Sequence, residues 1–195
     1  FARTERLLLR PNWPEDAAEL HQAIADEGIV RNLARAPWPY TADDAAAFTA
    51  QVHDALYPTF LLMLRTHGAP RLIGACGLGN YDGSTELGYW IARPYWGLGF
   101  ATEASRAVVN IAKAIGHKKL IASHFTDNPA SGNVLRKLGF QNTGKTSVRH
   151  SNGRSAAMTC ALYEKALDSA GAEPRPRLSP PAFNMRTQME RLQAA

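Results

Sequence analysis

The sequence contains little cysteine and no long apolar run, and both absences narrow the class of protein. Two cysteines among 195 residues, Cys76 and Cys160, are too few for a disulfide scaffold, and no histidine spacing extends them into a metal site. No stretch approaches the roughly 18 consecutive apolar residues of a membrane span. The chain starts without the charged and then apolar segment of an export signal. We therefore expect buried, reduced thiols, no metal, no membrane contact and a cytoplasmic location.

Charge is unevenly distributed along the chain. The net charge is +5, yet residues 93–167 alone carry 11 basic side chains against 3 acidic ones. Such a segment favours an anionic partner such as a phosphate, a nucleic acid or an anionic membrane surface, although an uneven solvated surface gives the same count. The sequence shows no helix-turn-helix, no aromatic ribonucleoprotein strand and no Lys/Arg run, so we expect no nucleic-acid partner.

Hydrophobic periodicity predicts one α+β domain over residues 1–167, followed by a Pro-rich C-terminal extension over 168–195. Four of the 12 prolines lie in this extension, which we expect to be either a linker with a segment that contacts a second subunit of a homodimer, or disordered. The turn signals Asp82-Gly83 and Asn152-Gly153 predict antiparallel hairpins. Helices are expected near residues 14–26, 41–56, 101–115 and 128–138, and strands near 6–10, 59–65, 71–79, 85–92, 119–123, 140–148 and 155–163.

The most informative segment lies between a strand and an amphipathic helix and reads Trp96-Gly-Leu-Gly-Phe-Ala101. Glycines at 97 and 99 allow the backbone to approach a ligand closely, and successive N–H groups then point the same way. The dipole of the following helix adds to this anion site, which suits a pyrophosphate. A tight turn before a helix also needs glycine, so the spacing alone leaves both explanations open.

The order of several further motifs resembles the GNAT N-acetyltransferases. Glu86-Leu-Gly-Tyr-Trp90 precedes the glycine segment, and Asn128-x-x-Ser131 and Lys137-Leu-Gly-Phe140 follow it. The resemblance covers about residues 3–165 and is strongest to the RimJ/RimL-like branch, which resembles ribosomal-protein N-terminal acetyltransferases. It implies a mixed, mostly antiparallel twisted sheet of about seven strands, flanked by about four helices and splayed at the cofactor site. It also implies acetyl-coenzyme A as donor and a primary amine as acceptor, either a protein N-terminus or a small molecule.

The resemblance implies a set of cofactor-binding residues. The strand before the loop would pair with the pantetheine arm through its backbone, the loop amides would hold the pyrophosphate, and Asn128 and Ser131 would line the thioester. In this order the residues are Ile91, Ala92 and Arg93, then Trp96, Gly97, Leu98, Gly99, Phe100, Ala101 and Thr102. Two positions depart from the family pattern: Trp96 replaces a Gln or Arg, and Leu135 replaces a Tyr that serves many relatives as general acid.

Acetyl transfer to an amine needs a base for the amine and a hydrogen-bond donor for the leaving thiolate. Glu86 is the expected base, because apolar neighbours such as Leu87, Tyr89 and Trp90 raise the pKa of a carboxyl group. An exposed glutamate at a strand end is the structural alternative. Ser131 is expected beside the sulfur, and a helix-start hydrogen bond to the backbone is its structural alternative.

The resemblance also places the loop between the first two helices beside the acceptor, where Trp38 and Tyr40 would bind a peptide or an aromatic amine. Packing of this Pro-Trp-Pro segment on the sheet edge explains it equally well. Tyr81 and His124 are further acceptor candidates, and a structural role is the alternative for each. A non-catalytic acyl-coenzyme A binding or regulatory module remains the second hypothesis for the whole chain, since the family's Tyr is absent.

Overall fold

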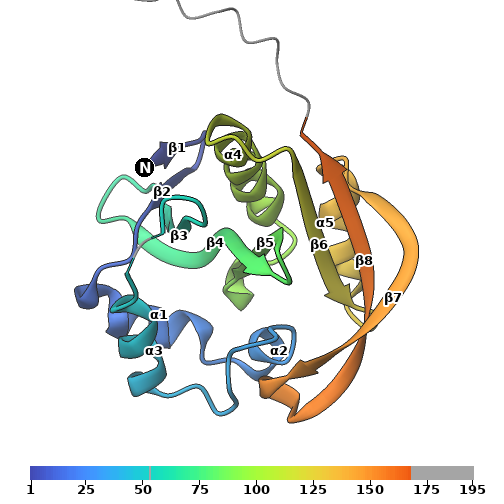
Figure 1. Ribbon diagram of the computed structural model, residues 1–195. Helices are drawn as coiled ribbons and strands as arrows, with labels where there is room; N and C mark the ends of the chain where they lie inside the picture. The colour runs from blue at the N-terminus through green and yellow to red at the C-terminus, as the bar shows by residue number, and fades with distance from the viewer. Residues whose placement is uncertain (53, 168–195) are drawn as a thin grey trace, which may run out of the picture.

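The computed structural model describes residues 1–52 and 54–167, which form one eight-stranded sheet with helices on both faces (Figure 1). The strand order is β1-β2-β3-β4-β5-β6-β8-β7. The strands are β1 (Ala2–Arg3), β2 (Leu7–Arg10), β3 (Thr59–Leu64), β4 (Arg71–Tyr81), β5 (Ser84–Ile91), β6 (Lys119–Phe125), β7 (Gln141–Ser151) and β8 (Ala156–Ala166). The helices are α1 (Ala17–Ile24), α2 (Glu27–Val30), α3 (Ala42–Thr49), α4 (Phe100–Ala114) and α5 (Pro129–Lys137).

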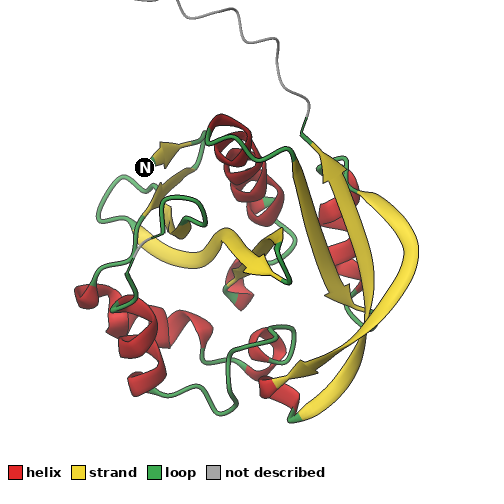
Figure 2. Cartoon of the chain, in the orientation of Figure 1, coloured by secondary structure: helices red, strands yellow, loops and turns green. Residues whose placement is uncertain are grey.

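Two hydrophobic clusters, one on each face of the sheet, form the core. Successive residues of a strand point to opposite faces, so neighbouring side chains of β4 enter different clusters. Ile73 and Cys76 pack with α4 and α5, whereas Leu72 and Ala75 pack with α1, α2 and α3. Figure 2 shows the helices distributed around the sheet in this way. Both cysteines are buried and free, which confirms the expected reduced thiols.

The sheet divides between β5 and β6, and this division is the feature that creates a site. All other neighbouring strands are antiparallel, but β5 and β6 are parallel and share a single paired position, Glu86 with Ile121. Beyond this pair the two strands separate toward their C-terminal ends (Figure 1). We call this opening the strand split. The mixed, mostly antiparallel and splayed sheet expected from the sequence is confirmed, with eight strands in place of about seven.

Most helix starts and turns agree with the sequence predictions, because local hydrogen bonds define them. Thr41 caps α3 through the Asp44 amide, and the Asp44 side chain returns the bond to Thr41. Asp82 and Gly83 both take positive φ values, 50° and 73°, in the predicted hairpin turn. Gly116 follows α4 with a φ of 102°, as a helix stop requires.

Two helix predictions were wrong in extent. The helix predicted over 14–26 consists of a 3₁₀ turn (Pro14–Asp16) and α1, with the short α2 after it. The helix predicted to reach Leu56 ends at Thr49. Val52 and Leu56, which would continue its apolar face, are exposed and have no core to pack against. The Pro-rich extension lies outside the described residues, and no described helix is long and apolar enough to span a membrane.

Candidate functional site

The loop before α4 has the backbone geometry of an anion site. Gly97 and Gly99 adopt φ values of 75° and 84°, in the left-handed region where other residues are strained. Within the part of the chain that the structure describes, no backbone amide from Gly97 to Thr102 has a hydrogen-bond acceptor. These donors lie at the positive end of the 15-residue helix α4. The loop therefore fits a group that brings several anionic oxygens.

Arg6 of the β1–β2 turn fixes this loop from a distant part of the chain. Its Nη1 donates to the Leu98 carbonyl at 3.0 Å, and its Nε donates to Glu103 Oε2 at 2.7 Å. The guanidinium also lies 4.1 Å from the centre of the Phe100 ring. Burial by itself raises the pKa of Glu103, but hydrogen bonds from Thr4 and Arg6 outweigh it, so the net pKa is lowered. Nothing in the local sequence near the loop predicted this contact.

A cavity of about 610 Å³ adjoins the loop along the first turns of α4. Gly99 and Thr102 line it, together with basic side chains from β1, the β1–β2 turn, α4 and α5. Glu5 and Glu103 are its acidic members, and Arg3, Arg6, Arg106 and Lys137 are its basic members. The excess of basic groups fits a phosphorylated ligand that also touches the loop.

The end of β5 makes several hydrogen bonds within the protein. The Ile91 carbonyl accepts a hydrogen bond from the Trp96 indole at 2.6 Å, and the Ala92 amide donates to Ile73 at 2.8 Å. Arg93 binds Asp26 at the start of α2 through Nε and Nη2, at 2.5 and 2.7 Å. These groups of Ile91, Ala92 and Arg93 are thus engaged within the protein, whereas residues 87–90 of β5 are not paired with β6.

Glu86 occupies the apex of the strand split, where β5 and β6 are still paired. Its Oε1 accepts hydrogen bonds from Arg149 Nη1 at 2.6 Å and from Ser123 Oγ at 3.1 Å. The expected apolar surround is therefore wrong: a guanidinium and a hydroxyl face this carboxylate. The Arg149 and Glu86 side chains are only 9% and 18% exposed, so the pair is largely shielded from water. Neither partner was foreseen, because both lie far from Glu86 in sequence.

Ser131 lies in the first turn of α5 and contacts Tyr89. The two hydroxyl groups are 2.9 Å apart, and the Tyr89 hydroxyl also donates to the Ser131 carbonyl at 3.1 Å. The Asn128 side chain caps α5 by accepting from the Ser131 amide at 3.4 Å. Burial raises the pKa of Tyr89. Tyr89, which the sequence reasoning treated only as an apolar neighbour, thus brings a phenol to Ser131, while Leu135 is buried in the core.

The two candidate catalytic groups approach the split from opposite faces of the sheet. Odd-numbered residues of β5 pack toward α4 and α5, where Tyr89 contacts Ser131. Glu86 points to the other face, together with Ser123 of β6 and Arg149 of β7. A ligand that passes through the split would therefore meet Glu86 on one side and the Ser131 hydroxyl on the other.

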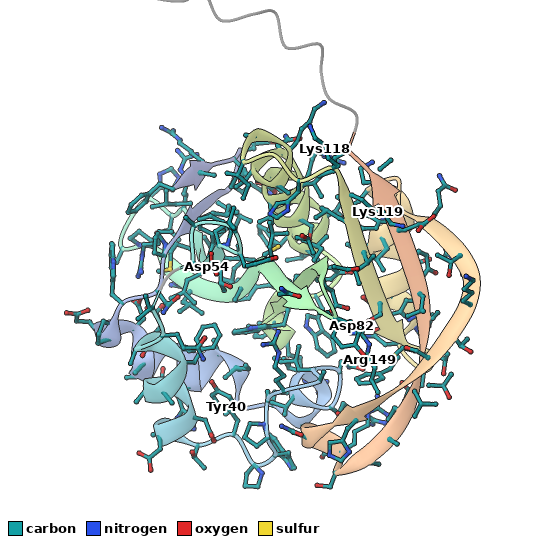
Figure 3. The ribbon with its side chains drawn as sticks, viewed as in Figure 1. Tyr40, Asp54, Asp82, Lys118, Lys119 and Arg149 are labelled. Atoms are coloured by element: carbon teal, nitrogen blue, oxygen red, sulfur yellow. The ribbon has the colours of Figure 1, made fainter. Side chains whose placement is uncertain are left out.

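The expected acceptor residues do not form one group. Trp38 and Tyr81 are 41% and 43% exposed, and the Arg149 guanidinium stacks 3.6 Å from the Tyr81 ring centre. Tyr40 is instead a core residue beside His21, and burial raises its pKa to about 12. Figure 3 shows Tyr40 at the helices, away from Arg149 at the strand split.

His124 also differs from its expected orientation. Its Nδ1 lies 2.8 Å from the Phe125 carbonyl, and its Nε2 lies 3.4 Å from the Tyr163 hydroxyl. A side chain on Gly132 of α5 would collide with the His124 ring. His124 is therefore packed between β8 and α5, on the face opposite Glu86.

Residues 139–146 match the sequence pattern of a phosphate-binding P-loop but do not fold as one. Gly139, Gly144, Lys145 and Thr146 have the spacing of a P-loop, which must form a loop between a strand and a helix. In this protein the segment leads from the end of α5 directly into the strand β7, where a P-loop would lead into a helix. The match therefore does not mark a nucleotide site.

Comparison with known proteins agrees with this geometry. A family model described as an acetyltransferase (GNAT) domain matches residues 6–141. The chain therefore belongs to the GNAT acetyltransferase family. Enzymes of this family are acyltransferases that use acetyl-coenzyme A as the acetyl donor. An uncharacterized N-acetyltransferase, YoaA of Bacillus subtilis, is 30% identical over 148 residues, which are 72% of this chain and 82% of the relative.

Solved structures share the fold at lower sequence identity. A GNAT acetyltransferase from Bacillus anthracis has a TM-score of 0.72 at 23% identity, covering 85% of this chain and 98% of that one. The microcin C7 self-immunity acetyltransferase MccE, in complex with acetyl-CoA and AMP, has a TM-score of 0.69 at 18% identity, with coverages of 84% and 94%. RimL, the ribosomal L7/L12 α-N-protein acetyltransferase in complex with coenzyme A, has a TM-score of 0.70 at 15% identity, with coverages of 85% and 97%.

Proposed function

We propose that this protein transfers the acetyl group of acetyl-coenzyme A to a primary amine by direct attack in a ternary complex. The observation that carries the proposal is the row of unpaired amides from Gly97 to Thr102, which ends beside a strand split with Glu86 at its apex. A pyrophosphate needs such donors, and an acyl chain needs a path through the sheet. The solved relatives MccE and RimL, described with acetyl-CoA or coenzyme A, support the same donor.

The proposed donor site has three parts. The amides of the Gly97–Thr102 loop bind the pyrophosphate, and the basic cavity beside α4 receives the phosphorylated end of the molecule. The separated edge of β5 offers its backbone to the pantetheine arm beyond Glu86. Acetyl-coenzyme A supplies an activated thioester, and the protein's own groups orient it and move protons.

Glu86 is the proposed base. The amine nitrogen forms the new C–N bond while the C–S bond breaks, and the proton lost by the amine goes to the free Oε2 side of the Glu86 carboxylate. Oε1 is held by Arg149 and Ser123, which fixes the direction of the carboxylate. Positioned proton transfer of this kind contributes about 10²–10⁴-fold in rate.

Ser131 is the proposed donor to the leaving thiolate. Its hydroxyl lies at the first turn of α5, and Tyr89 holds it from β5 at 2.9 Å. A thiol pKa near ~8.5 makes the thiolate a fair leaving group, so this hydrogen bond need supply only a modest share of the rate. Trp38 and Tyr81 remain the proposed aromatic borders of the acceptor space, since both are exposed.

The test is thiol release from acetyl-coenzyme A with a panel of peptides and small amines, for wild type, Glu86→Gln and Ser131→Ala. We expect turnover with at least one class of amine, strongly reduced turnover in Glu86→Gln and a smaller reduction in Ser131→Ala. Calorimetry with acetyl-coenzyme A serves as the control, because neither substitution touches the pyrophosphate loop. If the wild type binds acetyl-coenzyme A tightly but turns over no amine, a non-catalytic acyl-coenzyme A module would be favoured. If it neither binds acetyl-coenzyme A nor releases thiol, the proposed donor site would be rejected.

A further inference from the structure

The environment of Glu86 contains more hydrogen-bond donors than the carboxylate uses. Arg149 gives Nη1 to Glu86, and its guanidinium stacks on Tyr81. Its Nε is buried and has no hydrogen-bond partner within the described residues. The Ser147 hydroxyl, two residues earlier on β7, is likewise buried without a partner. Buried polar groups without a partner are rare, so the protein itself does not satisfy all the hydrogen-bonding groups around Glu86.

A second guanidinium lies close to the same carboxylate. Gly79 of β4 is the residue directly opposite Glu86 in the sheet. A Cβ on Gly79 would lie 3.2 Å from Arg35 Nη2, so Arg35 extends over the strand pair on the Glu86 face. No acidic side chain in residues 1–52 or 54–167 forms an ion pair with Arg35. Two guanidinium groups thus face one carboxylate, which leaves an excess of positive charge.

Open space lies beside this charged group. Gly88 follows Glu86 on the same face of β5, toward the strand split. It is exposed although β5 is an interior strand of the sheet. A Cβ built on Gly88 would have no atom within 4 Å, so at this position the face is not covered by α1, α2 or α3. A small molecule placed over Gly88 would lie beside Glu86 and near the Arg35 guanidinium, which extends over Gly79 on the neighbouring strand.

We propose that the acceptor is a small amine that also carries an anionic group, in the simplest case a carboxylate, held by Arg35 and Arg149. This inference rests on the proposed acetyltransferase function and names the substrate class of that site. The amine lies toward Glu86 over Gly88, and the anionic group takes hydrogen bonds from the exposed Arg35 guanidinium, within the positive field of Arg149. Guanidinium groups are permanently charged and their donor geometry matches carboxylate and phosphate oxygens. A peptide N-terminus offers only a neutral carbonyl here and would leave the excess charge unbalanced.

The experiment compares acceptors that differ only in the anionic group. Alanine, alaninamide and ethylamine form one series, and phosphoethanolamine with ethanolamine forms a second that separates phosphate from carboxylate. We expect kcat/KM for thiol release to be at least 10-fold higher for one anionic amine than for its neutral counterparts. Titration of the same amine into the protein with bound coenzyme A should show the preference by calorimetry as well.

Arg35→Gln should lower the ratio of anionic to neutral kcat/KM about 10-fold, and 0.5 M salt should lower it in the wild type. Arg71→Gln is the matched control, because Arg71 lies at the opposite end of β4 and is also exposed. The ratio of anionic to neutral kcat/KM in Arg71→Gln should equal that of the wild type. If Arg35→Gln does not fold, Arg35→Lys with the same salt series replaces it.

Equal kcat/KM across both series, or preference for neutral amines or peptides, would overturn the inference and leave the acetyltransferase function standing. Acetyl transfer to none of the amines or peptides would overturn the function, and the inference with it. A preference that survives Arg35→Gln and high salt would also contradict the proposed binding of the anionic group.

Discussion

The Tyr89 hydroxyl of β5 lies 2.9 Å from the Ser131 hydroxyl of α5, and this pair spans the strand split on the face opposite Glu86. Ser131 is held twice, since the Asn128 side chain also accepts from its amide. The phenol therefore comes from a strand, although the helical position where many relatives carry a tyrosine holds the buried Leu135. The pair gives Ser131 a fixed direction that a lone serine at a helix start would lack.

Tyr89→Phe should reduce kcat about 10-fold and change KM for acetyl-coenzyme A less than 3-fold. The substitution removes the hydroxyl that orients Ser131 and keeps the ring that packs in the core. The measurement is steady-state thiol release, with Ser131→Ala and the double variant beside it. If Tyr89 acts through Ser131, the double variant loses no more than Ser131→Ala alone, and additive losses would contradict a shared role.

Arg6→Ala should weaken the binding of acetyl-coenzyme A about 10-fold. The substitution removes the hydrogen bond to the Leu98 carbonyl, the ion pair with Glu103 and the stack on Phe100, all of which fix the pyrophosphate loop. Calorimetric titration with acetyl-coenzyme A measures the effect. Arg65→Ala is a suitable control, since the Arg65 side chain donates to the carbonyls of Thr4 and Glu5 and to none of the loop residues. Equal affinities for wild type and Arg6→Ala would show that the loop holds its shape without this contact.

Two glycine substitutions should separate the donor and acceptor sides. Gly99→Ala forces a side chain into a φ of 84° and should destabilise the protein by about 1–2 kcal/mol and weaken donor binding. Gly88→Ala meets no atom within 4 Å and should keep or slightly raise the free energy of unfolding. Its methyl group enters the open space beside Glu86, so acceptor KM should rise at unchanged donor affinity. Urea unfolding and kinetics of both variants check this, and an unchanged acceptor KM in Gly88→Ala would place the acceptor elsewhere.

The ion pair of Arg10 with Asp16 should make stability depend on pH. Asp16 accepts from Arg10 at 2.6 and 2.7 Å, and both side chains are nearly buried. Burial raises the pKa of Asp16, but the bonds from Arg10 and the Trp13 amide outweigh it and lower the pKa overall. The folded state therefore binds this proton less readily than the unfolded state. The stabilisation is complete above the unfolded pKa near ~3.9 and is lost as pH falls through the lower folded value.

Asp16→Asn should accordingly reduce the free energy of unfolding by about 3 kcal/mol at pH 7, and the difference from wild type should shrink below about pH 4. Urea unfolding at several pH values measures it. Asp82→Asn is the control, because Asp82 is exposed in a turn where asparagine is equally suited. A difference that stays constant with pH would mean that packing, and not the charge, accounts for the loss.

Local sequence patterns determined much of this protein. Alternation and helical spacing predicted the elements from β3 to β8, because each buries one face against the core. The glycine segment before α4 predicted a tight turn, and Gly97 and Gly99 adopt positive φ values there, which only glycine does without strain. The order of the motifs was sufficient to indicate the family that the matching family model confirms.

Tertiary structure alone decided which groups face one another. Arg149 reaches Glu86 from 63 residues away, and Arg6 reaches the pyrophosphate loop from 92 residues away. Tyr40 and His124 carry the residue types of a binding site, yet the fold places the first in the core and packs the second against α5. Periodicity records which face of an element is apolar, but it does not record which element covers that face. The partners of a buried charge depend on the register and splay of strands distant in sequence, and only the folded sheet sets these.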